Sequence, residues 1–216
     1  MIRLHHCPQT RSMRSLWLLH ELGVSFDVVT YPFDKTLREE PYRSLNPTGR
    51  VPTLEIDDVV LTESGAIAEY LCECFPQAGL GRDPSHDERP FWLNWIHFAE
   101  TISQHTAALT QQHIALYDDS MRSPIIMQLE AKRLAKTLAT VESRLEGEYL
   151  LSGFSAADIG VGQAVYMARH FVTLDRFPKL TAWFARLEAR PAYQRALPDG
   201  AGLYARDFYP PWESTP

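Results

Sequence analysis

The sequence contains few cysteines and no long apolar run. Its 216 residues include three cysteines, Cys7, Cys72 and Cys74, an odd number and too few for a disulfide framework. No stretch approaches the roughly 18 uncharged apolar residues of a membrane span, and the first residues lack the apolar segment of a signal peptide. We therefore expect a cytoplasmic protein, without membrane contact, in which Cys72 and Cys74 pack as small hydrophobic residues in or near a core.

The sequence also lacks a cluster of basic residues. It has 27 acidic residues against 21 Lys and Arg, a formal net charge of −6, and its cations are scattered. A general nucleic-acid binder usually shows a basic stripe, so this class of partner is not expected. The apolar fraction of 45% and the charged fraction of 22% are ordinary for a globular protein.

The first 75 residues alternate between two kinds of pattern. Short apolar runs predict four strands, at 2–6, 25–33, 51–56 and 59–62. Helical spacing of apolar residues predicts three helices, at 12–22, 36–45 and 63–75. The NPTG run at 46–49 predicts a turn. This order, βαβ then α then ββα, favours an α/β fold with a four-stranded mixed sheet.

The rest of the chain shows helical patterns alone. Pro, Gly and charged residues without periodicity predict a linker, so we divide the chain into a domain at 1–77, a linker at 78–88 and an all-helical domain at 89–216. Long helices are expected at 89–117 and 123–147, and further helices from Ser155 and from about residues 178 and 190. The last dozen residues, 204–215, are expected to form an irregular tail.

One stretch of the sequence has a pattern that is specific to a single protein family. Residues 45–67, LNPTGRVPTLEIDDVVLTESGAI, closely resemble the glutathione-binding core of cytosolic glutathione transferases. Further blocks of the chain resemble the same family in the same order: SMRSLWLLHELGVSFDVV, SGFSAADIGVGQAVY and FPKLTAWFARLEARPAYQRA. The resemblance implies a thioredoxin-like glutathione-binding domain followed by a helical bundle, of bacterial type but of no assigned class.

The resemblance also implies how the tripeptide is held. In the family, a cis-proline at the position of Pro52 leaves the backbone of the preceding residue, here Val51, free to pair with the cysteinyl backbone of glutathione like an added strand. Glu63 and Ser64 lie where a strand turns into a helix. A helix N-terminus suits the γ-glutamyl carboxylate, to which Ser64 can donate, and Glu63 can accept from the α-amino group.

Two cations are candidates for the glycyl carboxylate of glutathione. Arg50 stands where relatives often place Lys or Arg, and Lys35 lies in the variable segment after the second strand. By contrast, Ser155 and Asp158 match the Ser-x-x-Asp capping arrangement, which serves folding rather than chemistry.

The residue that activates the thiol is left open by the sequence. The expected first helix begins near residues 10–12, so Cys7, Thr10, Arg11 and Ser12 are the candidates, together with backbone N–H groups. One register of the family places the activating residue at Cys7, which would favour mixed disulfides with glutathione. Another places it at Thr10, which would act as a hydroxyl donor to a thiolate and favour conjugation.

No metal is expected, because His5 and His6 are consecutive strand residues and point to opposite faces. The electrophile site should lie between the two domains, near residues 8–12 and the inner face of the 89–117 helix. Candidate lining residues are Trp95, Phe98, Ala99 and Ile102, although such a stripe also suits a plain core.

The leading hypothesis is a homodimeric glutathione transferase that activates the glutathione thiolate for attack on a small hydrophobic electrophile. The alternatives are thiol-disulfide exchange or reductive deglutathionylation through Cys7, and a non-enzymatic member of the fold that binds glutathione or a protein. A third is an isomerase or dehalogenase that uses glutathione, although the Ser-Ser-Cys-like opening typical of isomerase relatives is missing.

Overall fold

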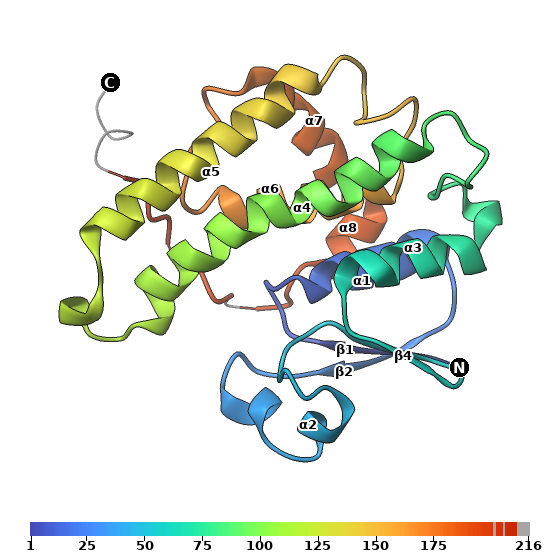
Figure 1. Ribbon diagram of the computed structural model, residues 1–216, viewed down its shortest axis with the longest axis horizontal. Coiled ribbons are helices and arrows are strands. Elements are labelled where there is room, and N and C mark those ends of the chain that lie inside the picture. Colours follow the sequence, from blue (N-terminus) through green and yellow to red (C-terminus); the bar gives the residue numbers. More distant parts are fainter. Residues whose placement is uncertain (201, 205, 211–216) are drawn as a thin grey trace.

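The computed structural model describes residues 1–200, 202–204 and 206–210. A four-stranded sheet lies at one end of the molecule, with α1 and α3 between it and the longer helices, and α2 on the opposite side (Figure 1). The elements of the first half are β1 Ile2–His6, α1 Ser12–Leu22, β2 Asp27–Thr30, η1 Lys35–Arg38, α2 Tyr42–Leu45, β3 Thr53–Ile56, β4 Val59–Leu61, α3 Ser64–Cys74 and η2 Pro76–Ala78. Those of the second half are α4 Arg89–Thr110, η3 Gln111–Ala115, η4 Asp119–Met121, α5 Pro124–Arg144, α6 Ala156–Ala168, α7 Pro178–Glu188 and α8 Pro191–Ala196.

The sheet is mixed, as the sequence predicts. Its strand order is β2-β1-β3-β4, with β1 parallel to β2 and antiparallel to β3, and β3 antiparallel to β4. Leu54 of β3 lies opposite Leu4 of β1 and Leu61 of β4. Because side chains alternate across a strand, this register turns Leu4 and Leu54 together into the core, where both are buried.

Three predicted elements of the first half differ from the structure by more than one residue. The strand expected at 51–56 is shorter, since β3 begins at Thr53. The strand expected at 25–33 is shorter, since β2 covers only Asp27–Thr30. The single helix expected at 36–45 is two short pieces, η1 and α2. Pro41 separates them: it has no N–H to donate, and it disfavours helical geometry at the preceding Glu40.

The long helices of the second half are close to prediction but end earlier. The helix expected to reach residue 117 ends at Thr110 and continues as the wider π-helical turn η3, and the one expected to reach residue 147 ends at Arg144. Ser155 and Asp158 form the predicted capping box. The Asp158 carboxylate accepts from the Ser155 N–H at 3.0 Å, and the Ser155 hydroxyl accepts from the Ala157 N–H.

One hydrophobic core runs through both halves. It includes the fully buried indole rings of Trp17 from α1, Trp92 from α4 and Trp183 from α7. Gly162 of α6 allows close packing, because a Cβ there would lie 2.6 Å from Leu187 and 3.2 Å from the Trp17 ring. The segment predicted as a linker is anchored to this core, since the Leu80 carbonyl accepts from the Trp92 indole N–H at 3.1 Å and the Ala156 N–H at 2.9 Å.

The three cysteines are free thiols. Cys7 and Cys72 are buried, whereas Cys74 is exposed, so the core position predicted for Cys74 is wrong. Two residues along a helix turn by about 200°, which carries Cys74 away from the core that Cys72 faces. Of the predicted tail, residues 204 and 206–210 are irregular, and residues 205 and 211–215 lie outside the described residues. Within the described chain, no helix is long and apolar enough to cross a membrane.

Candidate functional site

The segment before β3 presents an unpaired backbone. The Val51-Pro52 peptide bond is cis. In the part of the chain that the structure describes, no hydrogen bond engages the backbone N–H or C=O of Val51. Val51 is half-buried and lies two residues before β3. Its unpaired N–H and C=O offer the donor and the acceptor that an extended peptide needs for strand-like pairing.

Two side chains fix the residues on either side of Val51. The Arg50 carbonyl accepts from the Tyr42 hydroxyl at 2.5 Å and from the Asn46 side-chain amide at 2.8 Å. The same two groups bond the Thr53 hydroxyl, at 2.7 and 3.1 Å. Asn46 therefore does more than form the predicted turn, and Tyr42 is a positioning residue that sequence reasoning missed.

The turn itself requires a glycine at position 49. Gly49 has a φ of 61°, and a Cβ there would approach the Leu37 carbonyl oxygen to 2.8 Å. An L side chain would be strained by the backbone angle and blocked by the contact. Gly49 thus lets the chain turn back toward β3 beside η1.

The first turn of α3 forms the second part of the site. Ser64 is its first residue and is buried, while Glu63 precedes it in extended conformation and is exposed. The initial N–H groups of a helix have no intrahelical partner and carry partial positive charge, so they suit a carboxylate. The Ser64 hydroxyl oxygen accepts from the Arg14 guanidinium at 3.1 Å, which leaves its own proton for another acceptor.

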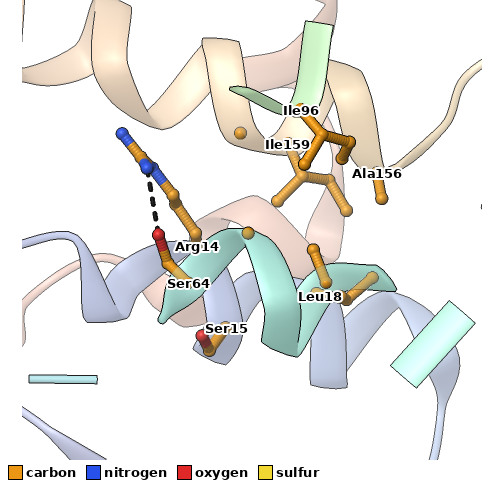
Figure 2. A pocket seen from close by; sticks show the side chains of 10 residues that line it. Arg14, Ser15, Leu18, Ser64, Ile96, Ala156 and Ile159 are labelled. Carbon is orange, nitrogen blue, oxygen red and sulfur yellow. Dashed lines mark hydrogen bonds between the residues drawn. The ribbon is translucent and has the colours of Figure 1, made fainter. Parts of the chain in front are cut away.

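A small cavity lies on the core side of Ser64 (Figure 2). It is lined from α1, α3, α4 and α6 by residues that include Arg14, Ser15, Leu18, Ile96 and Ile159. It has room for roughly one water molecule. This cavity is therefore too small for a peptide ligand.

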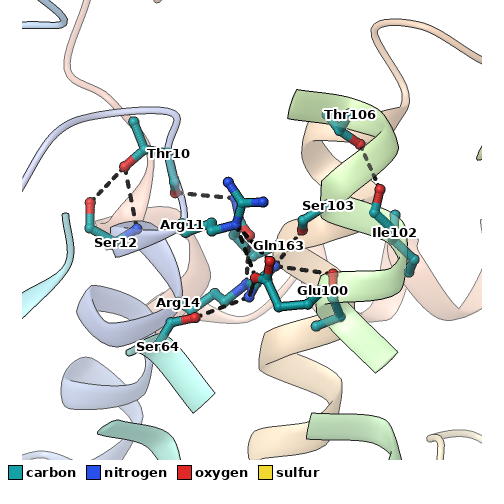
Figure 3. A network of polar contacts seen from close by, with 11 residues as sticks. Thr10, Arg11, Ser12, Arg14, Ser64, Glu100, Ile102, Ser103, Thr106 and Gln163 are labelled. Carbon is teal, nitrogen blue, oxygen red and sulfur yellow. Dashed lines mark hydrogen bonds and ion pairs between the residues drawn. The ribbon is translucent and has the colours of Figure 1, made fainter. Parts of the chain in front are cut away.

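Arg14 is the centre of a buried polar network (Figure 3). Its Nε donates to Gln163 at 2.9 Å, and its Nη1 donates to Ser64 and, at 2.5 Å, to Glu100. Its Nη2 donates to the Ala99 carbonyl at 3.3 Å and to the Ser103 hydroxyl. Sequence reasoning missed this network, because its partners come from α3, α4 and α6 and only the fold brings them together.

The loop between β1 and α1 holds the candidates for thiol activation. The Ser12 hydroxyl is fully buried, lies 2.8 Å from His6 Nδ1 and accepts from the Cys7 N–H at 3.1 Å. Thr10 is half-buried, and its hydroxyl lies 2.8 Å from that of Ser12 and donates to the Cys7 carbonyl at 2.8 Å. Of Cys7, Thr10 and Ser12, Thr10 is the one residue that is only half-buried.

Burial sets the protonation states of Cys7 and of the preceding His6, the last residue of β1. Cys7 is 1% exposed, and burial, reinforced by Asp34, raises the pKa of its thiol to about 11. Desolvation lowers the pKa of His6 to about 4, against the opposing effect of its hydrogen bond with Ser12. At neutral pH the structure therefore favours a neutral thiol at Cys7 and a neutral imidazole at His6.

The comparisons with known proteins agree on one family. The model of the glutathione S-transferase N-terminal domain matches residues 1–73. Glutathione S-transferase F6 of Arabidopsis thaliana is 30% identical over 203 residues, which cover 89% of this chain and 96% of that protein. The chain belongs to the glutathione S-transferase family.

Solved structures of transferases share the whole fold. A glutathione S-transferase from Xylella fastidiosa is 28% identical, with a TM-score of 0.81 over 91% of this chain and 97% of that one. A sphingomonad glutathione S-transferase, solved in complex with glutathione, is 25% identical, with a TM-score of 0.77 over 90% of this chain and 96% of that one. The thioredoxin-like first half and the helical second half predicted from the sequence are thereby confirmed.

Within this transferase fold, the three cationic candidates differ in what they bind. Arg11 pairs with Glu100 at 2.9 Å, so its charge is engaged beside Arg14. Lys35 is exposed and pairs with Glu39 at 3.4 Å. Arg50 is exposed, and its side chain makes no ion pair with any described residue.

The residues predicted for the electrophile pocket lie mostly inside the core. Trp95, Ala99 and Ile102 are buried, and Phe98 is half-buried with its ring against Trp95. Figure 3 shows instead Glu100 and Ser103 on the side of α4 that faces α1. The signal that singled out the four residues was helical periodicity, which marks a core-facing stripe as readily as a pocket.

The two histidines of β1 have separate partners, as their alternation predicts. His5 lies 2.9 Å from both the Tyr31 hydroxyl and Glu55, while His6 contacts Ser12. The described residues contain no group of three His, Cys, Asp or Glu side chains that suits a metal ion.

Proposed function

We propose that this protein is a glutathione transferase that ionises the thiol of bound glutathione and directs it to a small hydrophobic electrophile. The proposal that the protein binds glutathione rests on one observation. In the same domain, the unpaired backbone of Val51 offers a partner for strand-like pairing, and the first turn of α3 at Ser64 offers a site for a carboxylate. Glutathione has an extended backbone with a carboxylate at each end. Its backbone can therefore pair with Val51 while one carboxylate lies at the start of α3. The exposed Arg50 supplies a cation for the second carboxylate.

Thr10 is the residue we assign to thiol activation. A free thiol has a pKa near 8.5, and lowering it by about two units takes roughly 2.7 kcal/mol of preferential thiolate stabilisation. The N–H groups at the start of α1 and the Thr10 hydroxyl together suit a thiolate at this point. The Thr10 proton, which the Cys7 carbonyl accepts, turns outward by rotation about one bond when a thiolate is present.

The burial of Cys7 supports conjugation over thiol-disulfide exchange. Exchange through Cys7 needs a thiolate that an incoming disulfide can reach, whereas this sulfur is buried and its pKa is raised to about 11. Ser12 is a poor candidate for direct contact, because its hydroxyl is buried among the groups of its own loop.

Two activities measured side by side test the assignment. We expect the wild-type protein to conjugate glutathione with a chlorodinitrobenzene and to reduce a glutathione mixed disulfide far more slowly. Cys7→Ser should keep the conjugation activity. The proposal fails if the wild-type protein reduces the mixed disulfide efficiently and Cys7→Ser abolishes that reaction alone, or if neither reaction takes place.

We also propose that the protein works as a cytoplasmic homodimer. Several large apolar side chains are exposed in the isolated chain, namely Val59, Val60, Phe91, Ile125 and Leu129. A partner subunit that covers such side chains removes apolar surface from water. Light scattering after size exclusion should give about twice the 24.7 kDa of one chain, and a mass near 24.7 kDa would contradict the dimer.

A further inference from the structure

A chain of hydrogen bonds leads inward from Thr10 to His6. The Thr10 hydroxyl oxygen lies 2.8 Å from that of Ser12, and the Ser12 oxygen lies 2.8 Å from Nδ1 of His6. Figure 3 shows the contact between Thr10 and Ser12 at the start of α1. Thr10 is half-buried, Ser12 is fully buried and His6 is 5% exposed. His6 thus lies two hydrogen bonds behind the side chain that we assign to thiol activation.

The Ser12 hydroxyl has more polar neighbours than it can bond. Its oxygen can donate one proton and accept two hydrogen bonds. The Cys7 N–H takes one acceptor position at 3.1 Å, and the Cys7 carbonyl, also at 3.1 Å, can only accept. One acceptor position and one proton are then left for the contacts with His6, Thr10 and this carbonyl. The role that His6 takes therefore decides what is left for Thr10.

His6 can take either role, because burial lowers its pKa to about 4 and keeps the imidazole neutral at pH 7. One ring nitrogen then carries a proton and the other a lone pair. If Nδ1 carries the lone pair, it attracts the Ser12 proton, and the free lone pair of Ser12 draws the Thr10 proton inward. If Nδ1 carries the proton, it fills the last acceptor position of Ser12. Thr10 then cannot donate to Ser12, and its proton is left for the Cys7 carbonyl or for a ligand.

We infer that His6 is a positioning residue for thiol activation: its Nδ1–H donates to Ser12, the Ser12 hydroxyl donates to Thr10, and the Thr10 proton is left for the glutathione thiolate. This inference rests on the proposed function. The Ser12 proton is assigned to the nearer acceptor, since Thr10 lies at 2.8 Å and the Cys7 carbonyl at 3.1 Å. Three hydrogen bonds that run in one direction polarise one another, so they stabilise a thiolate more than Thr10 alone does. The side chains take up no proton, and the thiol releases its proton to solvent.

The pH dependence of conjugation tests this role. His6→Phe removes the Nδ1 donor and keeps an aromatic ring. The pKa of the bound glutathione thiol should then rise by about 0.5 to 1 unit, as for the loss of one indirect hydrogen bond. It is read from kcat/KM for a chlorodinitrobenzene at saturating glutathione, measured against pH. The activity should fall about three- to ten-fold below this pKa and return toward the wild-type value above it. The dissociation constant for glutathione should not change.

Two further variants separate the hydrogen bond from packing. His6→Asn restores a donor to Ser12 through its side-chain amide, so the thiol pKa should return to the wild-type value. Ser12→Ala interrupts the chain in the middle and should raise the thiol pKa at least as much as His6→Phe. The double variant should match Ser12→Ala, because the two changes remove the same interaction. If His6→Phe does not fold, Ser12→Ala and His6→Asn still give the comparison.

His20→Phe is the matched control. His20 lies near the other end of α1, where its ring packs edge-on against Phe26 with 5.2 Å between the ring centroids. This variant makes the same chemical change in the same domain, away from Ser12. It should leave the pH profile of conjugation unaltered. An equal shift in His20→Phe would trace the effect to general damage and overturn the role of His6.

The tautomer of His6 is measured directly by nitrogen resonances of isotopically labelled protein. We expect the proton on Nδ1, and a proton on Nε2 would overturn the inference. An unchanged thiol pKa in His6→Phe, or an equal rise in His6→Asn, would overturn it too. These results leave the proposed function intact. Absence of glutathione binding or of conjugation in the wild-type protein overturns the proposed function itself.

Discussion

The two ends of the candidate site are built differently. The amino-acid end consists of the Val51–Pro52 segment and the α3 N-terminus, and each leaves hydrogen-bonding groups for a ligand. The thiol end is the loop at 7–12, where the groups of Cys7, Thr10 and Ser12 mostly bond one another. Under the proposed function, the backbone supplies the binding groups, whereas thiol activation depends on the Thr10 side chain, which has to release an internal hydrogen bond.

The largest expected effect is at Thr10. Thr10→Val keeps the shape of the side chain and removes the hydroxyl, so conjugation measured as kcat/KM should fall about 100-fold, as for the loss of one donor to a developing anion. The dissociation constant for glutathione should change little, because the amino-acid end is intact. Thr10→Ser, which keeps the hydroxyl, serves as the matched control. A loss of less than about five-fold in Thr10→Val would move thiol activation to another group.

The second effect is the contribution of His6, next to the thiol end, to the stability of the protein in acid. The pKa of His6 is about 4 in the folded protein and near 6.5 when exposed, so the unfolded chain binds an extra proton between these values. Its contribution to stability is complete above pH about 6.5 and is lost as the pH falls toward 4. Between pH 7 and 5 this amounts to about 2 kcal/mol.

Urea unfolding of His6→Asn measures that contribution. The asparagine side chain can replace Nδ1 as the partner of Ser12 but does not titrate, so the variant should lose about 2 kcal/mol less than the wild type between pH 7 and 5. Other histidines titrate in both proteins and cancel in the difference. Equal losses in the two proteins would show that His6 is solvated.

A smaller effect separates the two exposed cations of the amino-acid end. Arg50→Gln should raise the dissociation constant for glutathione a few-fold, because an exposed charge contributes about 0.2–1 kcal/mol. Lys35→Gln should leave it unchanged, because that amine pairs with Glu39. Calorimetry on both variants decides between them, and the reverse ranking would assign the glycyl carboxylate to Lys35.

The smallest effect is expected at Cys7, whose thiol should not react at all. In native protein at pH 7.5, iodoacetamide should alkylate the exposed Cys74 and leave Cys7 and Cys72 unmodified, as shown by peptide mass spectrometry. In denatured protein all three should react. Native labelling of Cys7 as fast as that of Cys74 would reopen thiol exchange and weaken the contrast between the two ends.

The same contrast explains how far the sequence could lead. Val51, Pro52, Glu63 and Ser64 stand in consecutive motifs with local geometry, namely a turn, a strand start and a helix start. The pattern of apolar residues predicted the order of the elements, and the resemblance of these motifs to the transferase family implied the candidate binding end. Their role in holding glutathione stays a prediction. Arg14, Glu100 and Gln163 could not be found this way, because residues far apart in the chain meet only after the helices pack.

The sequence left the thiol-activating residue open for a different reason. Cys7, Thr10 and Ser12 all lie within six residues, and their order along the chain says nothing about which one is buried. The pocket residues chosen on α4 illustrate the same difficulty, since periodicity located the face that packs in the core and not the face toward α1. The burial of Cys7, Thr10 and Ser12 and the pKa of the Cys7 thiol depend on the whole fold. These properties distinguish the three candidates, whereas their spacing in the sequence does not.

The central claim is that glutathione pairs with the backbone of Val51 and places a carboxylate at the start of α3. Titration of isotopically labelled protein with glutathione, followed by amide resonances, tests it directly. We expect saturable shifts that are largest at the amides of Val51, Ser64 and Gly65. Saturable binding that leaves these three amides unmoved, or no binding at millimolar glutathione, would contradict it.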